Sequence, residues 1–283
     1  MASVLTGCRS ESAAPAAPPA AQGGGQQDAA GSGTPATSPG EGGSSSSPDE
    51  GTGSGPGASA PTGETAVEEL SPLGPPGSFA PAFLRPRPAS RLVVELLVEQ
   101  DGLQEASIDH LSTVLEEVTG KPVRPVVGRA PAGDGSWTGD DLRAAADTAG
   151  EERQGGAQAV MRILVVKGGF AGSDDALGVS VRGDVAAVFV DRVRGAGGPL
   201  TGSGRIEQAV VLHEAGHLLG LVDLYLHTGR QDSEHPGHST NRASVMYWAV
   251  ESDLVTELLG GGPPTEFDAA DRTDLARIRG EAG

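Results

Sequence analysis

The sequence has little that could form cross-links, carry positive charge or stack on bases. Cys8 is the single cysteine among 283 residues, which excludes an internal disulfide framework and a zinc site built from thiolates. Lysine occurs only at Lys121 and Lys167, aromatic residues make up 3%, and the formal net charge is −18 at pH 7. Because phosphates are bound by clustered Lys and Arg, this composition argues against nucleic acid as a partner and against a polybasic membrane patch. Runs of about 18 apolar residues, as a membrane-spanning helix needs, are missing.

The first third of the chain also has few aliphatic residues. Ala, Gly, Ser, Pro and Thr dominate residues 1–88, so this segment cannot bury enough apolar surface to offset chain entropy. We expect residues 9–88 to form a disordered tether. The residues Leu5-Thr6-Gly7-Cys8 resemble a bacterial lipobox, which implies a signal remnant over residues 1–8 and lipid modification at Cys8. The charged and apolar regions of a signal peptide do not precede it, and the alternative is an ordinary free cysteine.

From residue 89 to residue 283 the pattern is that of one folded domain. Apolar runs predict strands over residues 91–98, 122–127, 161–166, 177–182 and 185–191, the last two forming a hairpin closed by Gly183-Asp184. Helical periodicity predicts helices over residues 105–118, 139–149, 205–219 and 267–279. The third of these helices is apolar nearly all round, so we expect it to be buried. This order predicts an α+β fold.

The predicted buried helix contains the residues with the clearest chemistry, in the segment H-E-A-G-H that begins at His213. His213 and His217 are four residues apart, so both imidazoles lie on one helix face and can bind one zinc ion. Glu214 follows the first histidine, where it can reach a zinc-bound water without binding the metal. Two histidines and a glutamate inside an apolar helix need partners, and metal binding supplies them.

The residues after the second histidine strengthen this interpretation. Gly220 comes three residues after His217, where the helix must end if the chain is to turn back toward the metal, and glycine permits the positive φ of such a turn. Asp223 follows at the position expected for a third ligand.

The segment 211–223 resembles the metzincin signature H-E-x-x-H-x-x-G-x-x-H/D, and Ser244-Val245-Met246-Tyr247 resembles its Met-turn. The aspartate version is similar to that of snapalysin-like enzymes. The resemblance implies a twisted mixed sheet of about five strands with a helix layer, a buried active-site helix, and a small loop-rich C-terminal subdomain ending in a helix. It also implies one catalytic zinc ion and Met246 as a structural residue beneath the metal.

Two residues compete for the third ligand. Asp223 has the signature position, whereas His235, Ser239, Ser244 and Met246 resemble an archaemetzincin spacing with serine at both cysteine positions. Without those cysteines, the second zinc site of archaemetzincins is expected to be absent. His227, His235 and His238 all lie in the long loop after Asp223. The alternative for Asp223 is a carboxylate that caps the loop, and the alternative for His235 and His238 is that they are solvated loop histidines.

The resulting hypothesis is a zinc-dependent endopeptidase in which Glu214 is the general base. The resemblance implies a peptide or protein substrate that lies extended along an edge strand, for which residues 177–182 are the candidate. We expect a monomer outside the cytoplasm, either lipid-anchored to the bacterial cell envelope through Cys8 or secreted. The alternative is a non-catalytic, zinc-stabilised binding or adhesion module on a lipid-anchored stalk. The proton-carrying Glu214 favours the enzyme.

Overall fold

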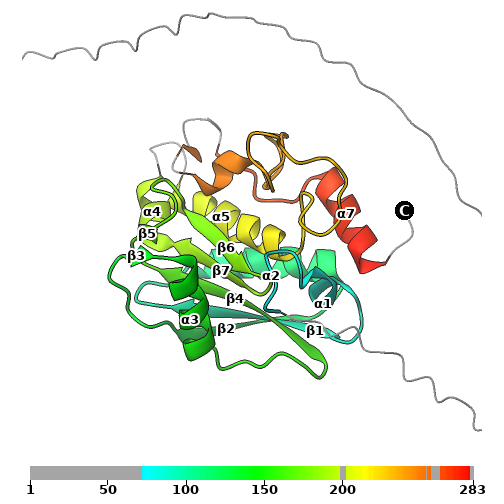
Figure 1. Cartoon of the computed structure of the whole chain (residues 1–283), viewed down its shortest axis with the longest axis horizontal. Coiled ribbons are helices and arrows are strands. Elements are labelled where there is room, and N and C mark those ends of the chain that lie inside the picture. Colours follow the sequence, from blue (N-terminus) through cyan, green and yellow to red (C-terminus); the bar gives the residue numbers. More distant parts are fainter. Residues whose placement is uncertain (1–71, 198–201, 253, 256–261, 281–283) are drawn as a thin grey trace, which may run out of the picture. The chain divides into compact units, whose positions relative to one another are not determined.

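The computed structural model of the chain describes residues 72–197, 202–252, 254–255 and 262–280 (Figure 1). Cys8 and most of the expected tether therefore lie outside the described residues. A sheet of five strands forms the centre, in the order β2-β1-β4-β7-β6. Its strands are β1 (Arg91–Val98), β2 (Val123–Arg129), β4 (Gln158–Val166), β6 (Gly178–Arg182) and β7 (Val185–Phe189). All pairings are parallel except that of β6 with β7, so the expected mixed five-stranded sheet is confirmed.

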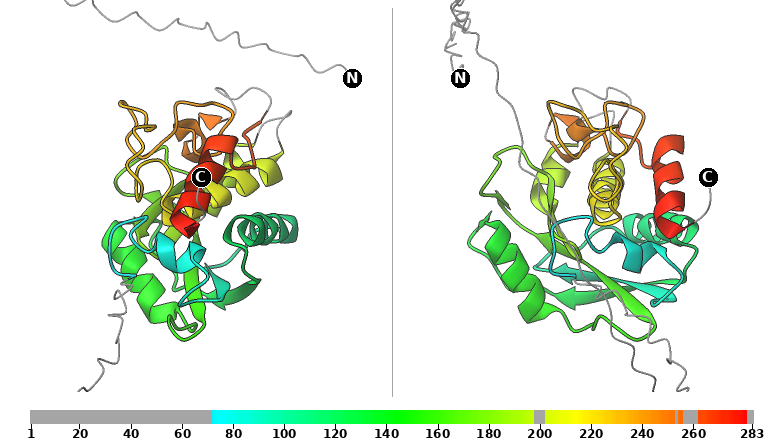
Figure 2. Two further views of the ribbon diagram at one scale, coloured as in Figure 1. Left: turned by 90° about the vertical axis from the view of Figure 1, so that its right-hand side faces the viewer. Right: turned by 45° about the vertical axis from the view of Figure 1, so that its right-hand side comes forward.

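The expectation of an α+β layout is wrong in one respect, because most of the sheet is parallel. Parallel neighbours need crossover connections, and α2 (Glu105–Thr119) connects β1 to β2 while α3 (Gly139–Ala149) connects β2 to β4. The crossover helices lie on opposite faces of the sheet, α3 on one face and α2 with the buried α5 (Ser203–Leu218) on the other (Figure 2). Helices on both faces of a mostly parallel sheet define the α/β class.

The alternation of side chains along the strands divides the core between these two faces. Leu92, Val94 and Leu96 of β1 join the larger core that surrounds α5, whereas Leu97 joins a smaller core beneath α3. Every residue of α5 from Ala209 to Leu218 is buried, as expected from its apolar sequence. The orientation of this helix is therefore fixed by packing on all sides.

The expected end of the tether at residue 88 is also wrong. Residues 72–88 fold onto the domain, and α1 (Ala80–Leu84) is buried along its whole length. Phe79 and Phe83 make an edge-to-face contact at 5.2 Å, and the Gly183 amide donates to the Gly74 carbonyl at 2.7 Å. Two phenylalanines and a leucine supply enough apolar surface to hold this segment, despite the proline and glycine around them.

Several short elements were not expected from the sequence. They are β3 (Ser136–Trp137) paired with β5 (Gly169–Phe170), α4 (Val190–Gly195) in place of the last two residues of an expected strand, and η1 (Trp248–Glu251). The final helix, α7 (Ala269–Arg279), begins with a capping box from Asp268 and Asp271. Within the described ranges, none of the helices has the length and apolar character needed to cross a membrane.

Candidate metal centre

The helix α5 places His213, Glu214 and His217 in the interior, with exposed fractions of 0%, 0% and 7%. The helix ends at Leu218, and Gly220 has a φ of 81° while its amide donates to the His217 carbonyl. A Cβ at Gly220 would lie 2.6 Å from the Cβ of Tyr225. Glycine is therefore required there by both backbone angle and space, and the chain turns back over the helix end.

The two helix histidines point their Nε2 atoms at one place. These atoms are 3.0 Å apart, and the Nδ1 of His213 bonds the Val245 carbonyl at 2.7 Å. A carbonyl can only accept, so Nδ1 carries the proton and the Nε2 of His213 keeps its lone pair. Burial, together with the neighbouring His213 and His238, holds the pKa of His217 well below its usual value. A neutral histidine with a free lone pair is the form that binds metal.

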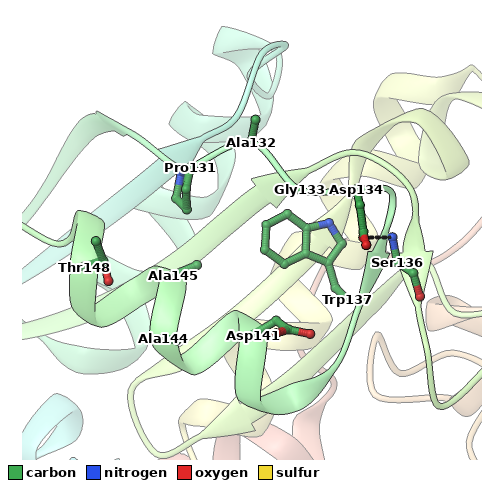
Figure 3. Close-up of a pocket in the computed structure, with 10 residues that line it drawn as sticks. All are labelled: Pro131, Ala132, Gly133, Asp134, Ser136, Trp137, Asp141, Ala144, Ala145 and Thr148. Carbon is green, nitrogen blue, oxygen red and sulfur yellow. Dashed lines mark hydrogen bonds between the residues drawn. The ribbon is translucent and has the colours of Figure 1, made fainter.

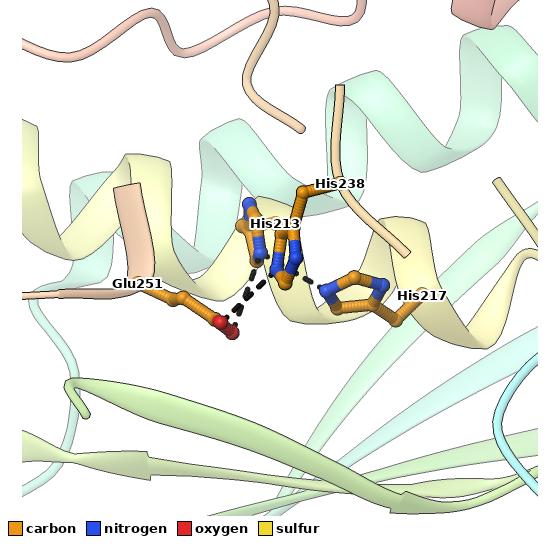
Figure 4. A group of neighbouring side chains, drawn as sticks. All are labelled: His213, His217, His238 and Glu251. Atoms are coloured by element: carbon orange, nitrogen blue, oxygen red, sulfur yellow. Dashed lines mark hydrogen bonds and ion pairs between the residues drawn. The ribbon is translucent and has the colours of Figure 1, made fainter. Parts of the chain in front are cut away.

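Two further side chains complete the group, His238 from the long loop and Glu251 from η1. The Nε2 of His238 lies 3.0 Å from Oε1 of Glu251, and the Nε2 of His213 lies 3.5 Å from Oε2 of Glu251. One ligand atom from each of His213, His217, His238 and Glu251 lies within 4.8 Å of all the others (Figure 4). Three imidazoles and a carboxylate thus converge from three segments of the chain.

This group fits a zinc ion. Imidazole nitrogen and carboxylate oxygen are ligands that zinc takes in proteins, and a tetrahedral ion with bonds of roughly 2.0–2.1 Å holds neighbouring ligand atoms about 3.3 Å apart. The separations of 3.0, 3.0 and 3.5 Å within the group are close to that value. The His213 and His217 nitrogens can share at most one proton between them, whereas a cation would satisfy both lone pairs.

His238 is held in place by backbone pairing on both sides. Its carbonyl accepts from the Asp232 amide at 2.7 Å, and the amide of Ser239 donates to the Met246 carbonyl at 2.8 Å. Gly237 has a φ of 85°, and a Cβ there would lie 4.0 Å from Cε1 of His217. The loop that carries His238 is therefore fixed between its own turn and the segment beneath the metal centre.

Met246 lies against the middle of the helix, where Gly216 leaves room for it. A Cβ on Gly216 would lie 2.3 Å from the Met246 sulfur. The Met246 amide donates to Oγ of Ser244 at 2.9 Å, and this hydroxyl donates to Oδ2 of the buried Asp271 at 2.7 Å. Arg230 forms ion pairs with Asp271 and Asp274 of α7. Hydrogen bonds thus tie the Met246 segment to the final helix, and ion pairs tie the loop that carries Arg230 to the same helix.

Glu214 lies beside this group and is held from the edge strand β6. Oγ of Ser180 donates to Oε2 of Glu214 at 2.7 Å, whereas Oε1 has no hydrogen-bond partner among the described residues. Burial, and then the nearby Glu251 carboxylate, raise the pKa of Glu214 well above its usual value. A carboxyl group in this position can act as an acceptor and then a donor of a proton.

A cavity of about 370 Å³ adjoins the centre. His238 and Glu251 form one side of it, Gly178 and Val179 of β6 form another, and Phe170, Pro236 and Trp248 provide apolar walls. A Cβ on Gly178 would lie 2.5 Å from Oε1 of Glu214, so the free oxygen of Glu214 lies next to the strand that lines the cavity. A bound molecule in the cavity would therefore contact His238 and Glu251 and lie against the strand on which Glu214 packs.

The two residues expected to compete for the third ligand are both outside the group. Oδ1 of Asp223 accepts from the Thr228 amide at 2.7 Å, from the Thr228 hydroxyl at 2.8 Å and from the Gly229 amide at 3.1 Å. Burial raises the pKa of Asp223, but the bonds from Thr228 outweigh it and lower the pKa. His235 stacks on Trp248, with ring centroids 4.2 Å apart. Val222 and Asp223 both take a positive φ, 51° and 65°, and the carboxylate caps the following turn.

His238 and Glu251 are the residues that sequence reasoning missed. The archaemetzincin-like spacing favoured His235, and loop length does not decide among these histidines because loops of different length close at similar cost. The available signal was proximity in the sequence, since His238 is the loop histidine nearest to Met246. Glu251 gave no signal, because a single glutamate after the Met246 segment is an ordinary surface residue.

A second hollow, of about 500 Å³, lies between α3 and the loop before it (Figure 3). Trp137 forms its floor, and Asp134 and Asp141 lie at its rim. Both carboxylates already have local partners: Asp134 accepts from the Ser136 amide, and Asp141 completes the capping box of Thr138. This hollow therefore offers no unpaired acidic group for a ligand.

Sequence comparison finds neither a matching family model nor a matching curated protein. Comparison of folds finds archaemetzincin from Methanopyrus kandleri at a TM-score of 0.47 and 20% identity, covering 69% of this chain and 98% of that one. Archaemetzincin from Archaeoglobus fulgidus gives 0.39 and 14%, covering 65% and 98%. A zinc-dependent peptidase from Methanocorpusculum labreanum gives 0.40 and 17%, covering 64% and 99%. What the centre can do is therefore decided by its own side chains.

Proposed function

We propose that this chain is a zinc-dependent endopeptidase of the metzincin type. The observation that carries the proposal is the buried Glu214 carboxylate, with one oxygen unpartnered, beside three converging imidazoles. His213, His217 and His238 would hold the ion. Met246 beneath the helix agrees with the structural role that the metzincin resemblance implies.

The zinc ion and Glu214 would each carry out part of the hydrolysis. When bound, zinc polarises the scissile carbonyl and makes water a better nucleophile at neutral pH. Glu214 takes the proton of the attacking water and passes it to the leaving amine. Ser180 holds Oε2, so the orientation of Oε1 is fixed before a substrate arrives.

The substrate would lie along β6, which is the last strand in the order of the sheet. An extended peptide can pair its backbone with such an edge while one side chain enters the adjoining cavity. The apolar walls from Phe170 and Trp248 favour a large apolar side chain there. Main-chain pairing would supply affinity for many sequences, and the cavity would supply preference among them.

One observation favours the alternative of a non-catalytic zinc module. The group contains four protein side chains, and structural zinc sites are closed by four protein ligands whereas catalytic sites keep a position open. Such a module would need zinc for stability but would have no use for the proton carrier Glu214. The two functions therefore differ in what a change at this residue does.

The test is Glu214→Gln in the full chain, with Glu234→Gln as a control at an exposed loop position. Glu214→Gln should retain one zinc ion per chain by atomic emission and lose at least about a hundredfold in casein cleavage, because general acid–base catalysis contributes about 10²–10⁴. Glu234→Gln should match the unmodified protein. Casein cleavage unaffected by Glu214→Gln, or none by the unmodified zinc-loaded protein, would contradict the proposed enzyme.

The remaining aspects of the proposal come from the sequence alone. Lipid modification of Cys8, a location at the cell envelope or in the medium, and a monomeric state are part of it. Each is compatible with a folded domain that begins no later than residue 72.

A further inference from the structure

Glu251 occupies a distinctive position in the metal centre. The side chains of His213 and His238 are 0% and 13% exposed, whereas that of Glu251 is 28% exposed and faces the adjoining cavity. The carboxylate is therefore the most accessible member of the group.

The backbone of Glu251 is joined to the strand that would receive a substrate. Its carbonyl accepts from the Leu177 amide at 2.7 Å, and Ser252 pairs with Ala176 just before β6. Gly178 and Val179 of β6 line the cavity together with Glu251. Glu251 lines this cavity beside His238, so a peptide that enters the cavity meets the carboxylate.

We propose that Glu251 is a fourth, displaceable zinc ligand that closes the metal centre at rest and is displaced when a substrate enters the cavity. This inference rests on the proposed function and explains why an enzyme has a four-membered group. Displacement falls on Glu251 because its side chain is the most exposed of the four, whereas His213 and His217 are buried. A glutamate also has a flexible side chain that can be rehydrated at the cavity. The resting enzyme would then hold less water at the metal than an open site does.

A closed resting state changes what a small metal-binding inhibitor must do. It has to displace Glu251 before it can bind, so its apparent affinity falls by the fraction of molecules that are open. If about one molecule in ten is open, removing the carboxylate should tighten binding about tenfold. The same removal should weaken zinc binding by about tenfold or more, because one ligand is lost.

The experiment compares Glu251→Ala and Glu251→Gln with Glu234→Ala, all in the full chain. Zinc affinity is measured by competition with a chromogenic chelator. The binding of acetohydroxamate is followed through the visible spectrum of the cobalt(II)-loaded proteins. Peptide cleavage is measured at saturating zinc. Glutamine keeps the size of the side chain, so Glu251→Gln provides the same measurements if Glu251→Ala does not fold.

The proposal predicts weaker zinc binding, tighter acetohydroxamate binding and a raised kcat/KM for both Glu251 variants, with Glu234→Ala unchanged. Unchanged zinc affinity would overturn it and leave the proposed peptidase intact. Loss of cleavage at saturating zinc would also overturn it, since Glu251 would then be required for turnover. If the unmodified protein cleaves no peptide while Glu251→Ala still weakens zinc binding, Glu251 is a fixed zinc ligand that a substrate does not displace. In that case both this inference and the peptidase function fail.

Discussion

Gly178 allows Glu214 to be disturbed without touching any metal ligand. An alanine Cβ at this position would lie 2.5 Å from Oε1, 2.9 Å from Cγ and 3.0 Å from Cδ of Glu214. An ordinary contact between carbon and oxygen is about 3.3 Å or more, so the carboxylate must move by nearly 1 Å. It cannot move freely, because Ser180 binds its other oxygen and the side chain is fully buried.

The expected loss follows from this displacement. A misplacement of about 1 Å in a catalytic group costs roughly a hundredfold in rate, which corresponds to about 2.7 kcal/mol of transition-state stabilisation. Gly178→Ala should therefore lower kcat about a hundredfold. Zinc stoichiometry should stay at that of the unmodified protein, because the three atoms nearest to the new methyl group all belong to Glu214 and none to a histidine. Crowding the core also costs about 1–3 kcal/mol of stability.

The assay measures kcat on a fluorogenic peptide at saturating zinc, well below the melting temperature of each variant. Gly195→Ala is the matched control, because a Cβ at Gly195 meets no atom within 4 Å. It should keep full activity. A folded, zinc-loaded Gly178→Ala with a kcat within about threefold of the unmodified protein would refute the assignment of Glu214 as the proton carrier.

Two further predictions concern the third ligand and a buried lysine. His238→Ala should weaken zinc binding at least about tenfold, whereas Asp223→Ala should leave it nearly unchanged because Asp223 caps a turn; the reverse order in chelator competition would restore Asp223 as the ligand. Lys121 is buried, donates to the Ala82 carbonyl, and has its pKa lowered by burial from 10.5 to about 8. The folded state therefore binds fewer protons than the unfolded state between pH 8 and 10.5. The loss of stability caused by burying the charged ammonium group is full below about pH 8 and disappears above about pH 10.5. The shift corresponds to about 3 kcal/mol, the lost hydrogen bond offsets about 1 kcal/mol, and Lys121→Met should raise the free energy of unfolding by about 2 kcal/mol at pH 7. In urea unfolding this gain should vanish as the pH approaches 10.5, and a gain independent of pH would contradict the burial penalty.

Much of the fold could be predicted because its elements are locally encoded. The strand at residues 91–98 and the helix at residues 139–149 coincide with β1 and α3. Apolar runs and the Thr138–Asp141 capping box depend on neighbours in the chain, so they act the same way in every fold. Short elements such as α1 were missed, because two phenylalanines among prolines give no periodic signal. Parallel pairing was missed because it depends on crossover geometry, not on the composition of the strands.

The candidate site divides in the same way. The sequence by itself determined the pair His213 and His217, the position of Glu214, the proposed proton carrier, between them, and the turn at Gly220, because helix geometry relates residues four apart by a fixed distance. Only the tertiary structure decided which side chains complete the centre. His238 and Glu251 reach the helix by way of loops whose closure depends weakly on length, and their positions are set by the turn at Gly237, the pairing of Ser239 with Met246 and the tie of Glu251 to Leu177. The pairing of Ser239 with Met246 and of Glu251 with Leu177 does not follow from a fixed sequence spacing. The folded chain was therefore needed to place His238, and not Asp223, next to the two helix histidines.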